Sequence, residues 1–289
     1  MHQKLDVSLF EHIIYPDKLY EGEDYQCLIR QSLEITEKEL ESVEPLIVLD
    51  LKGTNYTAHD TYFVAGNGLS WVYKGSQRVL MEEIFNRYQF GYEVWSAWLQ
   101  KESGLTKTVM PYVSGNQVYL TVPYAEELYR RRRTWLNLSG CQEIWINGRP
   151  IQGPLPSSAW EITFYYPKFK VTYRSRIKLI LQQLKIAKLL QAQWQAYYME
   201  QLERLNYHWT ISYPDSASCL KHVQPLDHEG LQQLTPEDYR IFLSMSAVKE
   251  TYEGMMHETN KRRHDQLKDT PYARDKIKYL IQCYKDWTL

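Results

Sequence analysis

The residues of this chain best suited to chemistry are basic, and they are concentrated in one region. Residues 128–188 contain twelve Lys or Arg against two acids, whereas residues 1–50 contain twelve acids against four bases. The whole-chain net charge of -1 therefore conceals one strongly basic and one strongly acidic segment. Because local potential governs attraction at short range, the basic region is suited to binding a polyanion.

The basic residues fall into a run of four arginines and a ladder that continues from a strand into a helix. Arginine guanidinium groups match phosphate oxygens in pairs, and Tyr124, Tyr129 and Trp135 flank the run with rings suited to stacking or cation–π contacts. In an extended strand, Lys168, Lys170 and Arg174 share one face. The candidate DNA-binding residues are Arg130, Arg131, Arg132, Arg133, Lys168, Lys170, Arg174, Arg176, Lys178, Lys185 and Lys188.

Ordinary solvated surfaces are the simpler explanation for such residues. The arginine run could pair with Glu126 and Glu127 in a helix or loop and bind nothing. The ladder argues against this explanation, since a solvated face usually mixes charges of both signs. We therefore expect the ladder to contact phosphates.

Residues that would support catalysis are sparse. The chain lacks HExxH, GxSxG, GxxxxGK[ST] and GxGxxG patterns, and its four cysteines are far apart without a CxxC pair. We expect the cysteines to be core thiols, and we expect neither an enzyme nor a cofactor. The carboxylates Asp50, Asp60, Glu82 and Glu83 leave a metal-dependent nuclease as an alternative.

The pattern of apolar residues predicts an α+β fold with a central mixed or antiparallel sheet. A helix is expected from Val79, ending near Gly91, and a long helix from Ile177 to Leu205. Thr235-Pro236 and Thr270-Pro271 have the residue types of helix starts, and Asn147-Gly148 predicts a hairpin. Strands are expected at 46–49, 61–64, 108–113, 118–122, 135–138, 143–146, 160–165 and 169–173.

Three segments follow from these elements. Residues 1–44 are expected to be an acidic helical segment, residues 45–190 the α+β DNA-binding domain, and residues 191–289 a helical extension. No apolar stretch is long enough to cross a membrane, and no signal peptide is recognisable. We therefore expect a cytoplasmic protein.

The segment from about Val79 to Leu190 resembles the competence transcription factor (ComK-like) family. The resemblance rests on the helix 80–88 with Gly91-Tyr92-Glu93 after it, on the paired segments 107–112 and 118–124, on Trp135 with Glu143-Ile144, on the hairpin 160–173, and on the basic helix that follows. The family continues Tyr-Glu with Gly-Arg where this chain has Val94-Trp95, and its Phe-Pro-Thr appears as Val122-Pro123-Tyr124.

The resemblance implies an activator of transcription that binds A/T-rich promoters and is turned over through an adaptor–protease system. We accordingly expect a DNA-binding transcription regulator whose partner is double-stranded DNA. The apolar positions of the long helix also suggest a homo-oligomer, or packing within the chain. The main alternative is a helical interaction or adaptor protein whose basic patch docks an acidic partner or the acidic N-terminal segment.

Overall fold

The computed structural model describes residues 13–14, 32–40, 43–51, 60–66, 69–87, 90–115, 117–123, 133–151, 156, 158–167, 169–204 and 218–246. The chain divides into two compact units, Met1–Leu243 and Ser244–Leu289. All but the first three residues of the second unit lie outside the described ranges, so the description below concerns the first unit.

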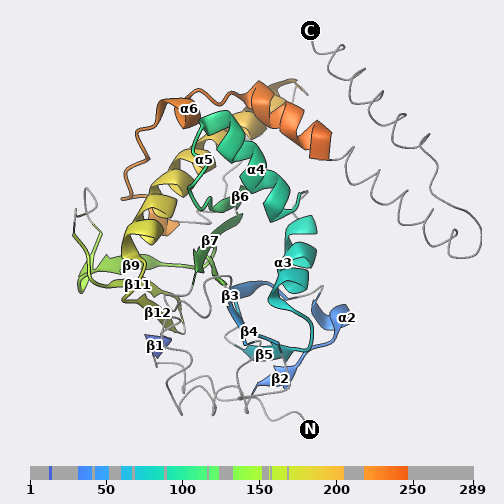
Figure 1. Ribbon diagram of the computed structural model, residues 1–289, viewed down its shortest axis with the longest axis vertical. Coiled ribbons are helices and arrows are strands. Elements are labelled where there is room, and N and C mark those ends of the chain that lie inside the picture. The colour runs from blue at the N-terminus through green and yellow to red at the C-terminus, as the bar shows by residue number, and fades with distance from the viewer. Residues whose placement is uncertain are drawn as a thin grey trace, which may run out of the picture. The chain divides into compact units, whose positions relative to one another are not determined.

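Two sheets organise this unit, and helices accompany them, as expected for an α+β fold (Figure 1). The larger sheet has the order β2-β5-β4-β3-β8-β7-β6 and the smaller one β1-β12-β11-β9-β10. Strands β2 and β5 pair in parallel, as do β1 and β12, while the other pairs are antiparallel. The strands are β1 Ile13–Ile14, β2 Leu33–Glu34, β3 Pro45–Asp50, β4 Thr61–Ala65, β5 Ser70–Tyr73, β6 Tyr112–Ser114, β7 Gln117–Pro123, β8 Arg133–Asn137, β9 Glu143–Ile146, β10 Arg149–Pro150, β11 Ile162–Tyr165 and β12 Lys170–Tyr173.

The helices include one that the sequence pattern did not predict. Gly91 is the N-cap of α4, and Gly104 ends it in a left-handed conformation with φ 72°. The expected helix end near Gly91 is thus the boundary between α3 and α4. The sequence pattern did not predict α4, because aromatic residues in this helix obscure the usual separation of apolar and charged faces. The helices are α2 Glu37–Leu40, α3 Gln77–Asn86, α4 Tyr92–Ser103, α5 Ile177–Arg204, the 3-10 turn η4 Ser218–Leu220, α6 Glu229–Gln232 and a further helix at 236–246.

Local turn and cap chemistry follows the sequence closely. Asn147 and Gly148 have φ values of 52° and 76°, and they join β9 to β10 in the expected tight hairpin. Thr235 and Asp238 cap the helix at 236–246 reciprocally, since each side chain accepts a hydrogen bond from the other residue's backbone N–H. The start expected at Thr270-Pro271 lies outside the described residues.

Some sequence expectations differ from the structure. Leu33 and Glu34 form β2 beside β5 instead of continuing a helical face, because pairing with Trp71 and Val72 satisfies their backbone. The expected strand at 108–113 is shorter and begins at Tyr112, and β5 was not predicted. The expected limit between residues 190 and 191 falls inside α5, which continues without a break to Arg204.

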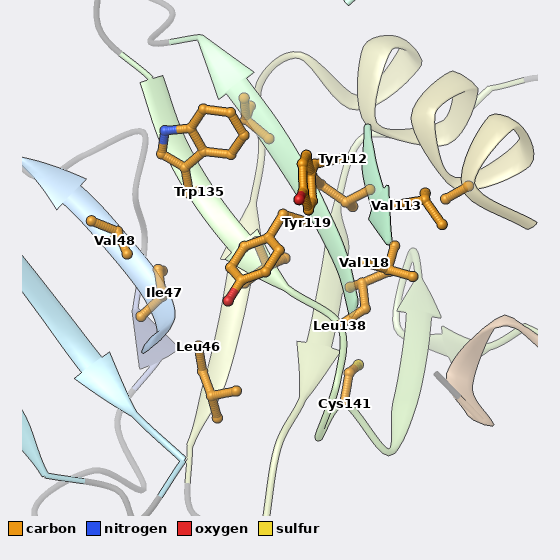
Figure 2. Packing of buried hydrophobic residues seen from close by; sticks show 14 of the residues in the cluster. Leu46, Ile47, Val48, Tyr112, Val113, Val118, Tyr119, Trp135, Leu138 and Cys141 are labelled. Carbon is orange, nitrogen blue, oxygen red and sulfur yellow. The ribbon is translucent and has the colours of Figure 1, made fainter. Parts of the chain in front are cut away.

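Buried aromatic residues join the large sheet to the helices. Phe85 of α3 stacks on Tyr112 with ring centroids 4.1 Å apart, and it meets Trp135 edge-on at 5.1 Å. Figure 2 shows Tyr112, Tyr119 and Trp135 in this core, with Ile47 and Val48 of β3 nearby. These contacts connect strands from distant parts of the chain to one apolar layer.

A second aromatic cluster joins α4, α5 and the helix at 236–246. Phe90 lies parallel to Trp194 of α5 at 5.9 Å and meets Phe242 edge-on at 4.9 Å. Trp95 contacts both Trp194 and Phe242, and Tyr239 packs against Trp194 at 4.8 Å. The face of α5 that carries Trp194 is therefore covered by residues of its own chain, while Met199 on the same half is 41% exposed.

The described cysteines are core thiols, as expected. Cys141 and Cys219 are both buried and neither forms a disulfide. Burial raises the pKa of the Cys141 thiol, and the neighbouring Cys219 thiol raises it further. Cys27 and Cys283 lie outside the described residues.

Candidate nucleic-acid interface

The centre of the candidate interface is the junction between β12 and α5. Phe169, Val171 and Tyr173 are buried, so the apolar face of β12 points to the core as expected. On the opposite face Lys170 is half-buried, but Thr172 is buried as well and its hydroxyl lies 2.9 Å from that of Thr163. Arg174 follows this strand, and its Nε lies 2.9 Å from Oε2 of Glu161. About half of the Arg174 side chain is exposed (48%). The Glu161 side chain is only 17% exposed, so the pair joins a half-buried carboxylate to a guanidinium that remains partly accessible to solvent.

Arg176 begins helix α5 in an unusual conformation. Its φ of 56° places a non-glycine residue in the left-handed region. Its carbonyl oxygen accepts hydrogen bonds from the backbone N–H groups of Leu179 (3.0 Å) and Ile180 (3.1 Å). The carbonyl of Arg176 thus accepts the first backbone hydrogen bonds of α5, and the Arg176 side chain is exposed.

Three lysines of α5 form a stripe along the helix. Lys178 is exposed, and Lys185 and Lys188 are half-buried. Positions seven apart lie nearly one above the other on a helix, and Lys188 is one turn further on, so the stripe is about 15 Å long. Half-burial suits lysine, because its methylene stem packs on apolar surface while the ammonium reaches solvent.

Lys170 is half-buried on the small sheet, beside aromatic rings. Its Nζ is 5.9 Å from the ring centroid of Tyr165, which packs at 5.0 Å against Trp145 of β9. Glu143 accepts a hydrogen bond from the indole N–H of Trp145 at 2.7 Å. This face therefore combines rings with a cation and one carboxylate.

Arg133 is the first residue of β8 and pairs with Pro123 of β7. One guanidinium nitrogen donates to the Tyr92 hydroxyl at 3.4 Å, and the guanidinium carbon lies 6.0 Å from the Tyr92 ring centroid. Burial raises the pKa of Tyr92, and the positive charge of Arg133 counteracts part of that rise. The cation–π partner is thus Tyr92, because the expected candidate Trp135 is buried in the core.

The other members of the arginine run lie outside the described residues. Arg130, Arg131 and Arg132 belong to the connection between Pro123 and Arg133, and Lys168 to the connection between β11 and β12. Tyr124, Tyr129, Glu126 and Glu127 are outside as well, so the proposed pairing of the run with acids stays a prediction.

A buried glutamine attaches α5 to the large sheet. Gln183 is fully buried, and its side-chain amide accepts from the backbone N–H of Thr121 (3.0 Å) and donates to the Thr121 carbonyl (2.7 Å). β6 pairs with β7 only as far as Tyr119, so Gln183 replaces the missing strand at this point. On its other side Thr121 pairs with Trp135 of β8, so β7 lies between α5 and β8 at this point.

The carboxylates considered for a nuclease do not form a metal centre in the described part of the chain. No group of three or more His, Cys, Asp or Glu side chains among the described residues could hold a metal ion. Glu82 pairs with Arg78 on the surface of α3 at 2.9 Å, while Asp50 ends β3 and Asp60 precedes β4.

The place where this chain departs from the competence-factor motif is part of the core. Trp95 is fully buried, and its indole N–H donates to the carbonyl of Pro111 at 2.9 Å. Val94 is half-buried and packs against the core. Position 95 therefore supports packing of α4 and is not exposed for a contact with DNA.

Comparisons with known proteins give no match: no family model, curated protein or solved structure corresponds to this chain. Among the described residues, no helix is long and apolar enough to cross a membrane.

Proposed function

We propose that this protein is a DNA-binding regulator of transcription that contacts duplex DNA through β12 and the first half of α5. The observation that carries the proposal is the charge of these elements. Between Glu161 and Glu200 the chain contains seven Lys or Arg and no acid. Six of these bases lie in described positions and are exposed or half-buried. These residues, Lys170, Arg174, Arg176, Lys178, Lys185 and Lys188, are called the basic surface below.

The arrangement is suited to the DNA backbone in particular. Phosphate contacts supply most of the affinity of such proteins and position them on the duplex. A stripe of about 15 Å on α5 can reach more than one phosphate, since each strand of duplex DNA carries one phosphate per about 3.4 Å of helix axis. Arg130–Arg133 would then contribute a second group of cations, and arginine enters the narrow minor groove of A/T-rich DNA favourably.

The resemblance to competence transcription factors supports the more specific role. Under this proposal the protein activates A/T-rich promoters in the cytoplasm without a cofactor, and its cellular level is controlled by an adaptor and a protease. Two copies on one promoter would allow two tracts to be bound one helical turn apart.

The competing functions differ in what they require of the basic surface. An interaction protein would use it for an acidic protein and show little affinity for duplex DNA. A nuclease would cut the same DNA only when a divalent metal ion is added. Binding of duplex DNA that stays intact after a divalent metal ion is added favours the regulator over both.

The proposal predicts that affinity for duplex DNA falls steeply as salt rises. We expect log K to fall with log salt by several units, since each phosphate contact contributes about 0.9. Titration of A/T-rich and G/C-rich duplexes at several salt concentrations measures this slope. Absence of binding at about 50 mM salt to every duplex would overturn the proposal.

A matched pair of variants locates the interface. Lys178→Ala with Lys185→Ala should lower the slope by about 2, because two contacts are lost. Lys101→Ala with Lys107→Ala removes two exposed lysines from another part of the unit and should leave the slope unchanged. Equal effects of the two pairs would place the interface elsewhere.

A further inference from the structure

One tryptophan of the small sheet lies on the surface instead of in the core. Trp160 is 62% exposed, the largest exposed fraction among the large apolar side chains of the described ranges. Trp95 and Trp194, by contrast, are fully buried. Single exposed apolar residues are common on protein surfaces, so the backbone and the charges around Trp160 decide whether it is suited to a contact.

The backbone at Trp160 is held in place by the side chain of Asn147. The Asn147 amide oxygen accepts hydrogen bonds from the backbone N–H groups of Trp160 (2.9 Å) and Glu161 (3.2 Å). Its amide nitrogen donates to the carbonyl of Ser158 at 3.5 Å, and its backbone N–H donates to the carbonyl of Glu161 at 3.0 Å. The backbone around Trp160 is thus tied to the turn between β9 and β10, so a contact through the indole requires little ordering of this segment.

Trp160 lies at the end of the small sheet where β12 passes into α5. Ile162, the first residue of β11, pairs with Tyr173, the last residue of β12. Trp160 stands two residues before Ile162, and Arg174 directly follows Tyr173. Glu161 joins the two segments through its ion pair with Arg174. The exposed indole is therefore next to a residue that contacts the basic surface.

Several cations belong to this end of the sheet. Arg149, the first residue of β10, is exposed, and so are Arg176 and Lys178 at the start of α5. Glu161 is an acid of this region, and Arg174 pairs with it. A nucleic acid offers phosphates to the cations and also the aromatic faces of its bases to the indole. An acidic protein complements the cations alone, so the combination favours a nucleic acid.

We propose that Trp160 inserts its indole between two base pairs of the DNA that the basic surface holds, and that it unstacks them. This inference rests on the function proposed above. Apolar side chains inserted in this way kink the duplex, and pyrimidine–purine steps such as TA unstack most easily. Trp160 thereby favours sequences that contain flexible base steps, whereas the cations bind the DNA backbone irrespective of sequence.

The first test uses the full chain and A/T-rich duplexes in which 2-aminopurine replaces each adenine, one at a time. This base fluoresces weakly inside a stack and strongly outside it. We expect its emission to rise at a TA step when the unaltered protein binds, and to stay low with Trp160→Ala. No rise at any position with the unaltered protein bound would overturn the inference and leave the proposed function standing. Absence of binding to every duplex would overturn both.

Affinity provides a second test with matched variants. Trp160→Ala should weaken DNA binding by about 5- to 150-fold, as expected for the loss of one base stack, without a change in the salt slope because no cation is removed. Trp160→Phe keeps a ring and should lose less. Val79→Ala truncates another exposed apolar residue, on α3, and should leave the affinity unchanged. Unchanged DNA affinity of Trp160→Ala would overturn the inference, and weaker binding of polyglutamate by that variant would then point to an acidic protein partner.

Discussion

Arg176 combines backbone strain with a charge that the proposed interface needs. An L-residue in the left-handed region is disfavoured by about 1–2 kcal/mol, and glycine would adopt this conformation without that cost. Strained residues persist where the surrounding structure holds them and often have a functional role. Replacement of Arg176 therefore tests whether the start of α5 belongs to the DNA-binding surface.

We expect Arg176→Gly to separate stability from binding. Relief of the strain is partly offset by the greater freedom of glycine in the unfolded chain, about 0.5–1 kcal/mol, so the melting temperature should stay constant or rise slightly. Affinity for duplex DNA should fall several-fold and the salt slope by about 0.9. Arg176→Lys keeps the charge and should restore the slope. Unchanged affinity of the glycine variant would exclude Arg176 from the interface.

The attachment of α5 to β7 depends on one polar side chain in an apolar contact. Gln183 bonds both backbone groups of Thr121, beyond the end of β6. Around it, Ile180, Leu184 and Ala187 are buried. Gln183 therefore sets the position at which α5 lies along the strand, and with it the position of the lysine stripe.

Replacement of this glutamine should cost stability out of proportion to its size. Gln183→Leu has similar volume but leaves the N–H and C=O of Thr121 buried without partners, at about 1–3 kcal/mol each. We expect a loss of about 3 kcal/mol in the free energy of unfolding, measured by urea denaturation. Gln182→Leu, at the neighbouring half-buried position, should change it by about 0.5 kcal/mol or less. Equal effects would show that the two hydrogen bonds contribute little.

The buried apolar residues of α5 pack against other parts of the same chain. Leu190, Trp194 and Tyr197 are buried, and Trp194 packs on Phe90 and Tyr239. Self-association through this face would require these contacts to open. A homo-oligomer, which remains a prediction, would have to use another surface.

Two truncations distinguish an extension from a part of the core. A chain ending at Leu190 loses Trp194, Tyr239 and Phe242, and we expect insoluble protein or a large loss of folded structure by circular dichroism. A chain ending at Leu243 keeps these residues and ends at the limit of the first unit, so it should stay folded. A folded, soluble chain ending at Leu190 would show that the aromatic cluster is dispensable.

Local patterns were sufficient for much of the fold. Short runs of apolar, β-branched and aromatic residues bounded by turn residues predicted β3, β4, β7 and β9, helical spacing predicted α5 to within one residue, and Asn147-Gly148 predicted its hairpin. Charge counts likewise identified the basic residues. These features depend on interactions between residues close in sequence, and residue type alone determines such interactions to a large extent.

Contacts between distant residues were decided only by the tertiary structure. The pairing of Ile13 with Lys170, the bond of Gln183 to Thr121 and the burial of Trp135 all join positions whose local sequence carries no sign of a partner. Short edge strands such as β1 and β2 form because a neighbouring strand supplies hydrogen bonds. Tertiary packing therefore decides which basic residues lie on one surface and which segment packs beside them. The spacing of residues along the chain does not encode this packing.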